Sequence, residues 1–348
     1  MHCQSLDRYG AALAPRESRT PLPVGGEVLI KVRHCGVCHS DLHLADGYFD
    51  LGGGKHLDIR EGRTLPFILG HEIEGTVAAA GPQAQDVTPG HAYAVYPWIG
   101  CGTCAACRSG NEPCCDTPRQ IGINVDGGYS SHVLVPDSRY LLDIHGIDPP
   151  LAGALMCSGL TAFSALKKLA VQAQNGPILI VGLGGVGLMA LEFAKTLFHR
   201  APLVADIDAG KRRMALKRGA AVAYDPADPG ARQAIMSETG GVPGAVDFAG
   251  SQGSFVFANA ALRKGGRLVV AGLLGGSFQM PIPMLPLRAV TIGGSLAGSL
   301  EDARMMMDLV RSGVVEAPPI ERRPLAEANQ ALADLKAGRV QGRIVLTP

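Results

Sequence analysis

The chain has 348 residues, which corresponds to about two domains of about 150 residues each and excludes a small scaffold held together by disulfides. Hydrophobic residues make up 47% of the chain and charged residues 18%, a composition that excludes a disordered protein. The net charge of +1 argues against a nucleic-acid or anionic membrane partner and favours a small molecule as the ligand.

β-rich segments dominate the first part of the chain. Between Gly26 and about Leu142, short candidate strands such as Glu27–Arg33 and Ser130–Val135 alternate with glycine, proline and aspartate turns. Helical periodicity is scarce here. We therefore expect a β-rich domain over residues 1–150.

A different pattern begins after about Leu151, where strand candidates alternate with segments of helical length. In chain order these strand candidates are Ile178–Val181, Leu203–Ala205, Val222–Tyr224, Ala245–Phe248, Arg267–Leu273 and Val290–Gly293. This alternation predicts a doubly wound parallel sheet in an α/β domain over residues 151–290. The remaining segment, 291–348, has helical patterns at Leu300–Arg311 and Leu325–Ala337 and a probable strand at Ile344–Leu346.

The first residues contain no apolar run followed by a small-residue cleavage site. We therefore expect no secretory leader, and we expect the protein to be cytoplasmic. Two uncharged stretches, 149–166 and 268–287, are interrupted by glycine or proline and are not expected to cross a membrane. In a reducing compartment, the nine cysteines are expected to be metal ligands, nucleophiles or core residues rather than disulfides.

One group of cysteines has the spacing C-x2-C-x2-C-x7-C and consists of Cys101, Cys104, Cys107 and Cys115. Four thiolates in a short loop predict a closed tetrahedral zinc site that holds the loop in shape. An iron–sulfur cluster is the competing interpretation. Cys114 stands beside Cys115, and we expect Cys115 to be the fourth ligand and Cys114 a free thiol.

A second candidate metal site consists of Cys38, His71 and Cys157, which are far apart in the sequence. Each of them alone is more simply explained as a buried structural residue. Their polar neighbours favour a metal site instead, because residues 38–43 are Cys-His-Ser-Asp-Leu-His and Glu72 follows His71. Three protein ligands would leave the fourth position open, as a catalytic zinc requires.

A dinucleotide-binding turn is predicted after the strand that ends at Val181. It consists of Gly182, Leu183, Gly184, Gly185, Val186 and Gly187 and opens a helical segment whose N-terminus favours a pyrophosphate. Asp206 ends the next strand, where a carboxylate would accept hydrogen bonds from the adenosine ribose and repel a 2′-phosphate. This favours NAD over NADP, although a glycine turn without nucleotide and a merely solvated Asp206 are the simpler alternatives.

Together these residues resemble the zinc-dependent alcohol dehydrogenases of the medium-chain dehydrogenase/reductase superfamily. The motifs that carry the resemblance are Gly36–Asp41, Gly70–Glu72, Gly100–Cys104 with Cys107 and Cys115, Met156–Thr161, Gly182–Gly187 and Asp206–Asp208. It implies a GroES-like catalytic domain from residues before about 150 and after about 290, with a Rossmann domain between them. It also implies NAD and two zinc ions per chain, one catalytic and one structural.

The resemblance assigns roles residue by residue. Cys38, His71 and Cys157 would bind catalytic zinc, Glu72 would sit behind it, Asp41 would fix the tautomer of the ligand histidine, and Ser40 and His43 would pass the substrate proton to solvent. Cofactor contacts are implied for the phosphates at His39 and Arg343, for the nicotinamide side at Thr161 and Leu273, and for the adenosine ribose at Lys211. For His39, Lys211 and Arg343, a solvated surface charge is the alternative.

The implied reaction is reversible hydride transfer between a primary or secondary alcohol and NAD, as in a general alcohol dehydrogenase. A polyol or sugar dehydrogenase of the same superfamily and a non-catalytic nucleotide-binding redox sensor are the alternatives. The segment 47–64 is about ten residues longer than the common family pattern, and we expect it to be a loop that shapes specificity, with Tyr48, Phe49 and Trp98 as pocket walls. The large extra lobe of some relatives is not evident, which favours a homo-tetramer over a dimer.

Overall fold

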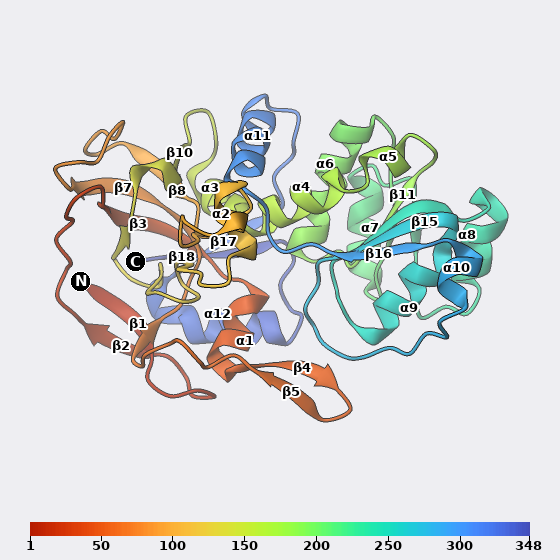
Figure 1. Ribbon diagram of the computed structural model, residues 1–348, viewed down its shortest axis with the longest axis horizontal. Helices are drawn as coiled ribbons and strands as arrows, with labels where there is room; N and C mark the ends of the chain where they lie inside the picture. Colours follow the sequence, from red (N-terminus) through yellow and green to blue (C-terminus); the bar gives the residue numbers. More distant parts are fainter.

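Strands from both ends of the chain build one mixed sheet, which lies at the left of Figure 1. The computed structural model describes all residues, 1–348. Six strands follow the order β10-β8-β7-β3-β18-β17, and β9 also pairs with β3. The strands are β3 (Val28–Gly36), β7 (Glu72–Ala80), β8 (Ala92–Val95), β9 (His132–Val135), β10 (Leu141–Asp143), β17 (Ile320–Pro324) and β18 (Arg343–Thr347). Because β18 pairs antiparallel with β3, the C-terminal residues lie beside the segment that leads to Cys38.

Smaller elements complete this half of the molecule. They are a sheet of β1 (His2–Leu6), β2 (Ala14–Glu17) and β6 (Phe67–Ile68), a hairpin of β4 (Tyr48–Gly52) and β5 (Lys55–Asp58), the helices α1 (His39–Asp46), α2 (Ala105–Arg108), α11 (Leu300–Arg311) and α12 (Ala328–Lys336), and the 3₁₀ turns η1 (Glu112–Cys114), η2 (Ser138–Tyr140) and η4 (Leu325–Glu327). The expected loop at 47–64 therefore contains the hairpin.

A second, fully parallel sheet occupies the right of Figure 1, in the order β13-β12-β11-β14-β15-β16. Its strands are β11 (Ile178–Val181), β12 (Leu203–Ala205), β13 (Val222–Tyr224), β14 (Val242–Asp247), β15 (Leu262–Val270) and β16 (Thr291–Gly294), and its helices are α5 (Ala170–Ala173), α6 (Gly185–Phe198), α7 (Ala209–Lys217), α8 (Ala231–Thr239), α9 (Gln252–Ala261) and α10 (Met284–Arg288). The first strand, β11, lies between β12 and β14, so the strand order reverses there, where ligands bind in such sheets. The sheet extends one strand beyond the boundary expected at residue 290, because β16 follows it.

A continuous helical segment, Pro149–Lys167, passes between the two sheets and consists of α3 (Pro149–Ala154), the π-helical turn η3 (Leu155–Gly159) and α4 (Leu160–Lys167). It is long and apolar enough to cross a membrane, but 89% of its most apolar stretch is buried within the protein. One cluster of buried apolar side chains runs from the mixed sheet through this segment to α6. The segment is therefore a core helix shared by both halves.

Candidate active site

Four sulfur atoms meet in the loop that carries α2 and η1. The Sγ atoms of Cys101, Cys104, Cys107 and Cys115 lie within 4.8 Å of one another, and those of Cys104 and Cys107 are 3.5 Å apart. Sulfur ligands about 2.3 Å from a tetrahedral zinc would lie about 3.8 Å apart, so the set fits this ion. Backbone N–H groups also donate to three of the four sulfurs, which suits thiolates. Cys114 is exposed and stands outside the cluster.

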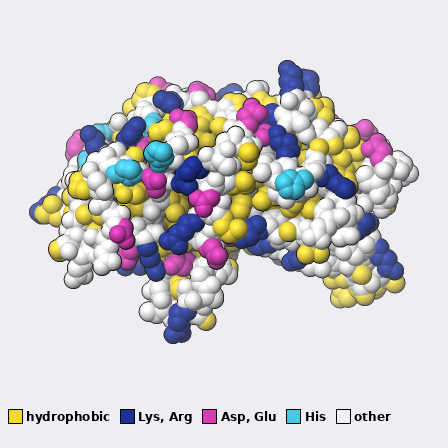
Figure 2. Space-filling view, turned by 90° about the horizontal axis from the view of Figure 1, so that it is seen from above, with side chains coloured by type: hydrophobic (Ala, Val, Ile, Leu, Met, Phe, Trp, Pro, Cys, Tyr) yellow, Lys and Arg dark blue, Asp and Glu magenta, His cyan; other side chains and the backbone are white.

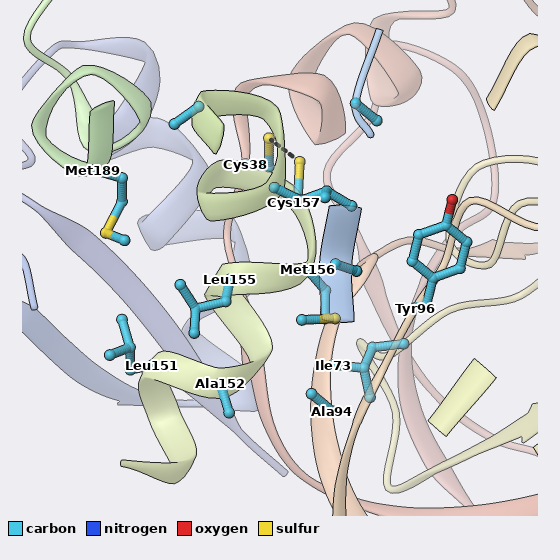
Figure 3. Close-up of a cluster of buried hydrophobic side chains, with 14 of the residues drawn as sticks. Cys38, Ile73, Ala94, Tyr96, Leu151, Ala152, Leu155, Met156, Cys157 and Met189 are labelled. Carbon is cyan, nitrogen blue, oxygen red and sulfur yellow. Dashed lines mark hydrogen bonds between the residues drawn. The ribbon is translucent and has the colours of Figure 1, made fainter. Parts of the chain in front are cut away.

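A second cluster brings together Cys38, His71, Glu72 and Cys157, whose ligand atoms also lie within 4.8 Å of one another. Figure 3 shows the sulfurs of Cys38 and Cys157 facing each other, 3.9 Å apart. Cys157 lies on the π-helical turn η3, a type of turn that occurs often at functional sites. The structure thus joins three residues that sequence spacing alone could not connect.

Unpartnered polar atoms at this cluster indicate a site that binds a ligand. Nε2 of His71 and Oε1 of Glu72 are buried and have no hydrogen-bond partner in the protein. Buried polar atoms are nearly always paired, so these two atoms indicate that an ion or ligand binds beside them. Two sulfurs and an imidazole nitrogen are donors that zinc prefers, and the cluster fits a zinc ion with one position left for substrate.

Local backbone structure explains how these side chains converge. Cys38 is the N-cap of α1, and its backbone N–H donates to Oδ2 of Asp41 at 2.9 Å. Gly36 ends β3 directly beside Glu72, and a Cβ atom at Gly36 would lie 2.0 Å from Oε2 of Glu72. Glycine is therefore required at residue 36 to admit the Glu72 carboxylate.

Asp41 lies beside the histidine of the cluster. Its Oδ1 lies 3.2 Å from Nδ1 of His71, which leaves Nε2 as the nitrogen available to a metal. The hydroxyl of Tyr129 donates to Oδ2 of Asp41 at 2.9 Å, and both side chains are fully buried. Tyr129 was not predicted, because a lone tyrosine 88 residues from Asp41 carries no local signal.

Glu72 has a partner that the sequence did not suggest. Nη2 of Arg343, at the start of β18, forms a buried ion pair with Oε2 of Glu72. Burial raises the pKa of Glu72 to about 7, although the Arg343 guanidinium opposes this. Arg343 also lies against the glycine turn, since a Cβ atom at Gly185 would be 2.5 Å from Cδ of Arg343. Arg343 thus links the metal cluster to the predicted cofactor site.

The glycine turn has the geometry expected of a dinucleotide site. Gly182 has a φ of +88°, and a Cβ atom at Gly187 would lie 1.8 Å from the Gly182 carbonyl oxygen, so α6 packs closely on β11. Gly184 is the N-cap of α6, and a Cβ atom there would meet nothing within 4 Å. The Asp206 carboxylate accepts the Leu183 N–H at 2.7 Å, which fixes it beside the turn.

One cavity of about 940 Å³ connects the metal cluster to the glycine turn. Of the predicted residues, it is lined by Cys38, His39, Ser40, His43, Cys157, Thr161, Gly182, Gly184, Gly185, Val186, Gly187, Asp206, Lys211, Leu273 and Arg343. Asp41, His71, Glu72 and Leu183 are fully buried and do not line it. Most residues predicted for the catalytic and cofactor sites therefore line one cavity.

The two candidate relay residues, Ser40 and His43, lie on α1 and face this cavity. Burial lowers the pKa of His43, which keeps its imidazole neutral near pH 7. The ring of Phe49, from the hairpin β4-β5, packs on His43 with ring centroids 4.7 Å apart. Phe49 and Trp98 are cavity walls as predicted, whereas the prediction for Tyr48 is wrong, because its ring stacks on His56 within the hairpin.

Several polar residues that the sequence did not single out also line the cavity, and four of them come from the catalytic-domain half: Glu61, Arg63, Gln120 and Asn124. They come from the segment after the hairpin and from a turn near Trp98. No metal or nucleotide motif contains them, and only the folded chain places them at the site.

The comparisons with known proteins agree with this geometry. Residues 25–145 match the model of the alcohol dehydrogenase GroES-like domain, and residues 185–312 match that of the zinc-binding dehydrogenase domain. The chain is 33% identical to the NAD-dependent alcohol dehydrogenase of Saccharolobus solfataricus, with all of both chains covered.

Two solved structures are also similar over the whole chain. The alcohol dehydrogenase of Aeropyrum pernix has a TM-score of 0.90 and 28% identity, with 100% of both chains covered. The D-arabinose dehydrogenase of Sulfolobus solfataricus has a TM-score of 0.85 and 26% identity, with 100% of this chain and 99% of the other covered. The same fold therefore occurs with different substrates.

Proposed function

The chain belongs to the zinc-binding alcohol dehydrogenase family, and from this membership we propose that it catalyses reversible hydride transfer between a primary or secondary alcohol and NAD. The observation that carries the proposal is the single cavity that joins Cys38 and Cys157 to the glycine turn at Gly182. Alcohol and cofactor would share this cavity, which would orient them toward each other.

Cys38, His71 and Cys157 would hold one zinc ion, and the cluster around Cys104 would hold a second. When bound at the first cluster, zinc supplies Lewis acidity toward the oxygen of the alcohol or carbonyl group. Asp41 keeps His71 in the tautomer that presents Nε2, and Tyr129 in turn holds Asp41.

NAD serves as the hydride acceptor in alcohol oxidation and would lie along the other half of the cavity. The N-terminus of α6 and the side chains of His39 and Arg343 would face its phosphates, and Asp206 and Lys211 would face its adenosine ribose. Thr161 and Leu273 would border the nicotinamide.

Ser40 and His43 would carry the hydroxyl proton of the substrate to solvent. They lie three residues apart on α1, so both side chains share one face of the helix. Because the pKa of His43 is lowered by burial, its neutral imidazole can accept a proton near pH 7.

The test is an assay of the purified, zinc-loaded protein with NAD and a panel of primary, secondary and polyhydroxy alcohols. Formation of NADH with at least one alcohol supports the proposal. A protein that binds NAD and zinc but turns over no alcohol would instead be the redox sensor considered above. A polyol or sugar is the second candidate substrate class, because Glu61, Gln120 and Asn124 give the cavity a polar wall.

Replacing Asp206 by glycine should raise the ratio of kcat/KM for NADP over NAD by about tenfold or more, because a carboxylate that repels the 2′-phosphate is removed. Steady-state kinetics with both cofactors measures the ratio. Asp228→Gly is the matched control, since Asp228 is exposed and does not line the cavity. An unchanged ratio in a folded Asp206→Gly protein would remove Asp206 from the cofactor site.

We also propose that the protein is a cytoplasmic homo-tetramer. The strand β16 forms an open edge of the parallel sheet, and several exposed apolar side chains precede it, including Ile282 and Leu287, which are 79% and 67% exposed. Hydrophobic side chains gather at the lower right of Figure 2, on the lobe of the parallel sheet, whereas charges of both signs are scattered elsewhere on this face. An unpaired strand edge beside such a patch suits a second copy of the chain.

Light scattering should therefore give a molar mass of four times the 36.2 kDa chain mass. The double variant Ile282→Glu and Leu287→Glu should have a lower molar mass, because the new carboxylates would be buried at the interface. Exposed Val171→Glu, on another helix, is the control. A monomeric wild-type protein would contradict the tetramer.

A further inference from the structure

Arg63 is a cation at the cavity wall that has no acidic partner. Its Nε donates to the carbonyl oxygen of Ile123, and its Nη1 is buried without a hydrogen-bond partner. No carboxylate lies within ion-pair distance of its guanidinium, and the ring of Phe67 lies 5.9 Å from its Cζ. Because the half-buried guanidinium of Arg63 has no anion beside it in the protein, it can pair with one that enters the cavity.

Gln120 is a second unpartnered group on the same wall. Only 7% of its surface is exposed, it lines the cavity, and neither its carboxamide oxygen nor its carboxamide nitrogen makes a hydrogen bond in the protein. The carboxamide of Gln120 is therefore free to form hydrogen bonds with a ligand in the cavity. Asn124, in the same turn, lines the cavity as well.

Arg63 and Gln120 belong to one structural unit that reaches the metal cluster. The backbone N–H groups of Asn124 and Val125 donate to the Gln120 carbonyl oxygen, and Arg63 holds this turn through Ile123. Arg119 and Ile121, the neighbours of Gln120, donate to the carbonyl groups of Ile99 and Pro97.

These two carbonyl groups flank Trp98, whose ring centroid lies 5.8 Å from that of His71. The two unpartnered groups therefore lie on the catalytic-domain side of the cavity. Asp206 and Lys211, in contrast, line it from the parallel-sheet domain. An anion at Arg63 would thus belong to the substrate rather than to the cofactor.

We propose that the substrate is an alcohol that carries a carboxylate, which the Arg63 guanidinium and the Gln120 carboxamide bind. This inference rests on the proposed alcohol dehydrogenase function and adds its substrate class. In the reaction, the carbinol carbon loses hydride to NAD⁺ and the hydroxyl loses its proton, so a hydroxy acid becomes an oxo acid with NADH and H⁺ as the other products. Arginine suits this recognition, because its planar fork pairs with both oxygens of a carboxylate.

Glu61 is the one acidic residue of this wall; its side chain is exposed and forms no ion pair with Arg63. The hydroxyl groups of a neutral polyol would form hydrogen bonds with Gln120 and Asn124 but would leave the positive charge of Arg63 without a counter-charge. For this reason a carboxylate satisfies the wall better than a sugar does.

The experiment compares kcat/KM for a series of ω-hydroxy acids of increasing chain length, each measured beside its neutral amide, with NAD in excess. For the chain length that fits best, the wild-type protein should prefer the acid by about tenfold or more, because only the carboxylate forms an ion pair with the Arg63 guanidinium. Arg63→Gln should lower kcat/KM for the acid to the value for the amide, mainly by raising KM. It should leave kcat/KM for the amide within about twofold of the wild-type value. Gln120→Leu should also lower kcat/KM for the acid.

Arg119→Gln is the matched control, because Arg119 is exposed, adjoins Gln120 and does not line the cavity. Equal wild-type kcat/KM for acid and amide at every chain length would overturn the proposal, and so would a preference for sugars that Arg63→Gln leaves unchanged. The wild-type comparison holds even where a variant fails to fold.

If no alcohol of any kind is oxidised, the proposed function fails, and the carboxylate site is then tested by binding alone. Quenching of NADH fluorescence by butanoate in wild type, lost in Arg63→Gln but kept in Arg119→Gln, would support the site. No binding of butanoate would overturn it.

Discussion

Replacing His71 with alanine should lower kcat/KM for every alcohol by at least about a thousandfold, because losing even one donor to a reacting oxygen costs about 10²–10³. His71 is fully buried and is the only nitrogen donor of the cluster that contains Cys38 and Cys157. Without it, two sulfurs remain and the first zinc is lost or misplaced. Binding of NADH, measured by fluorescence, should stay within about twofold, since His71 does not line the cavity.

His145→Ala provides the control for this change, because His145 is exposed and lies outside both metal clusters. It should keep wild-type turnover and two zinc ions per chain. If His71→Ala were folded and still oxidised alcohols at the wild-type rate, the assignment of the catalytic metal site would be wrong.

Removing Cys104 should have the largest effect on stability. Cys104→Ser leaves three sulfurs around an ion that needs four, so the second zinc and the loop from Cys101 to Cys115 that it holds are destabilised. Loss of a structural metal belongs to the mechanisms that cost about 4 kcal/mol or more. At about 2–4 °C per kcal/mol, the melting temperature should fall by about 10 °C.

The matched control is Cys114→Ser, which changes the exposed cysteine beside the cluster. It should leave both the melting temperature and the zinc content unchanged. A Cys104→Ser protein that melts like wild type with only one zinc per chain would contradict the structural role of the loop.

Local patterns predicted the parts of the fold that depend on local chemistry. The strands at Ile178–Val181 and Leu203–Ala205 were predicted at the residues where β11 and β12 lie, because buried strands of a parallel sheet are continuous apolar runs. Likewise, the choice of Cys115 over Cys114 agrees with the cluster found, since η1 ends at Cys114 and the next residue turns inward.

Long-range pairing accounts for what the sequence did not predict. The ion pair of Arg343 with Glu72 depends on β18 lying beside β3, and the hydrogen bond of Tyr129 with Asp41 joins a loop to a helix. No periodicity or spacing in the sequence predicts either of these two contacts. The polar wall of Arg63 and Gln120 was missed for the same reason, because Arg63 meets the turn of Gln120 only through tertiary contacts.

Zinc reconstitution shows whether the chain oxidises alcohols with zinc and NAD. Metal-free protein is titrated with zinc while NADH formation from an alcohol substrate and bound zinc are followed together. We expect no turnover without zinc and full turnover once about two zinc ions are bound per chain. Full turnover by a protein that holds no zinc would contradict it.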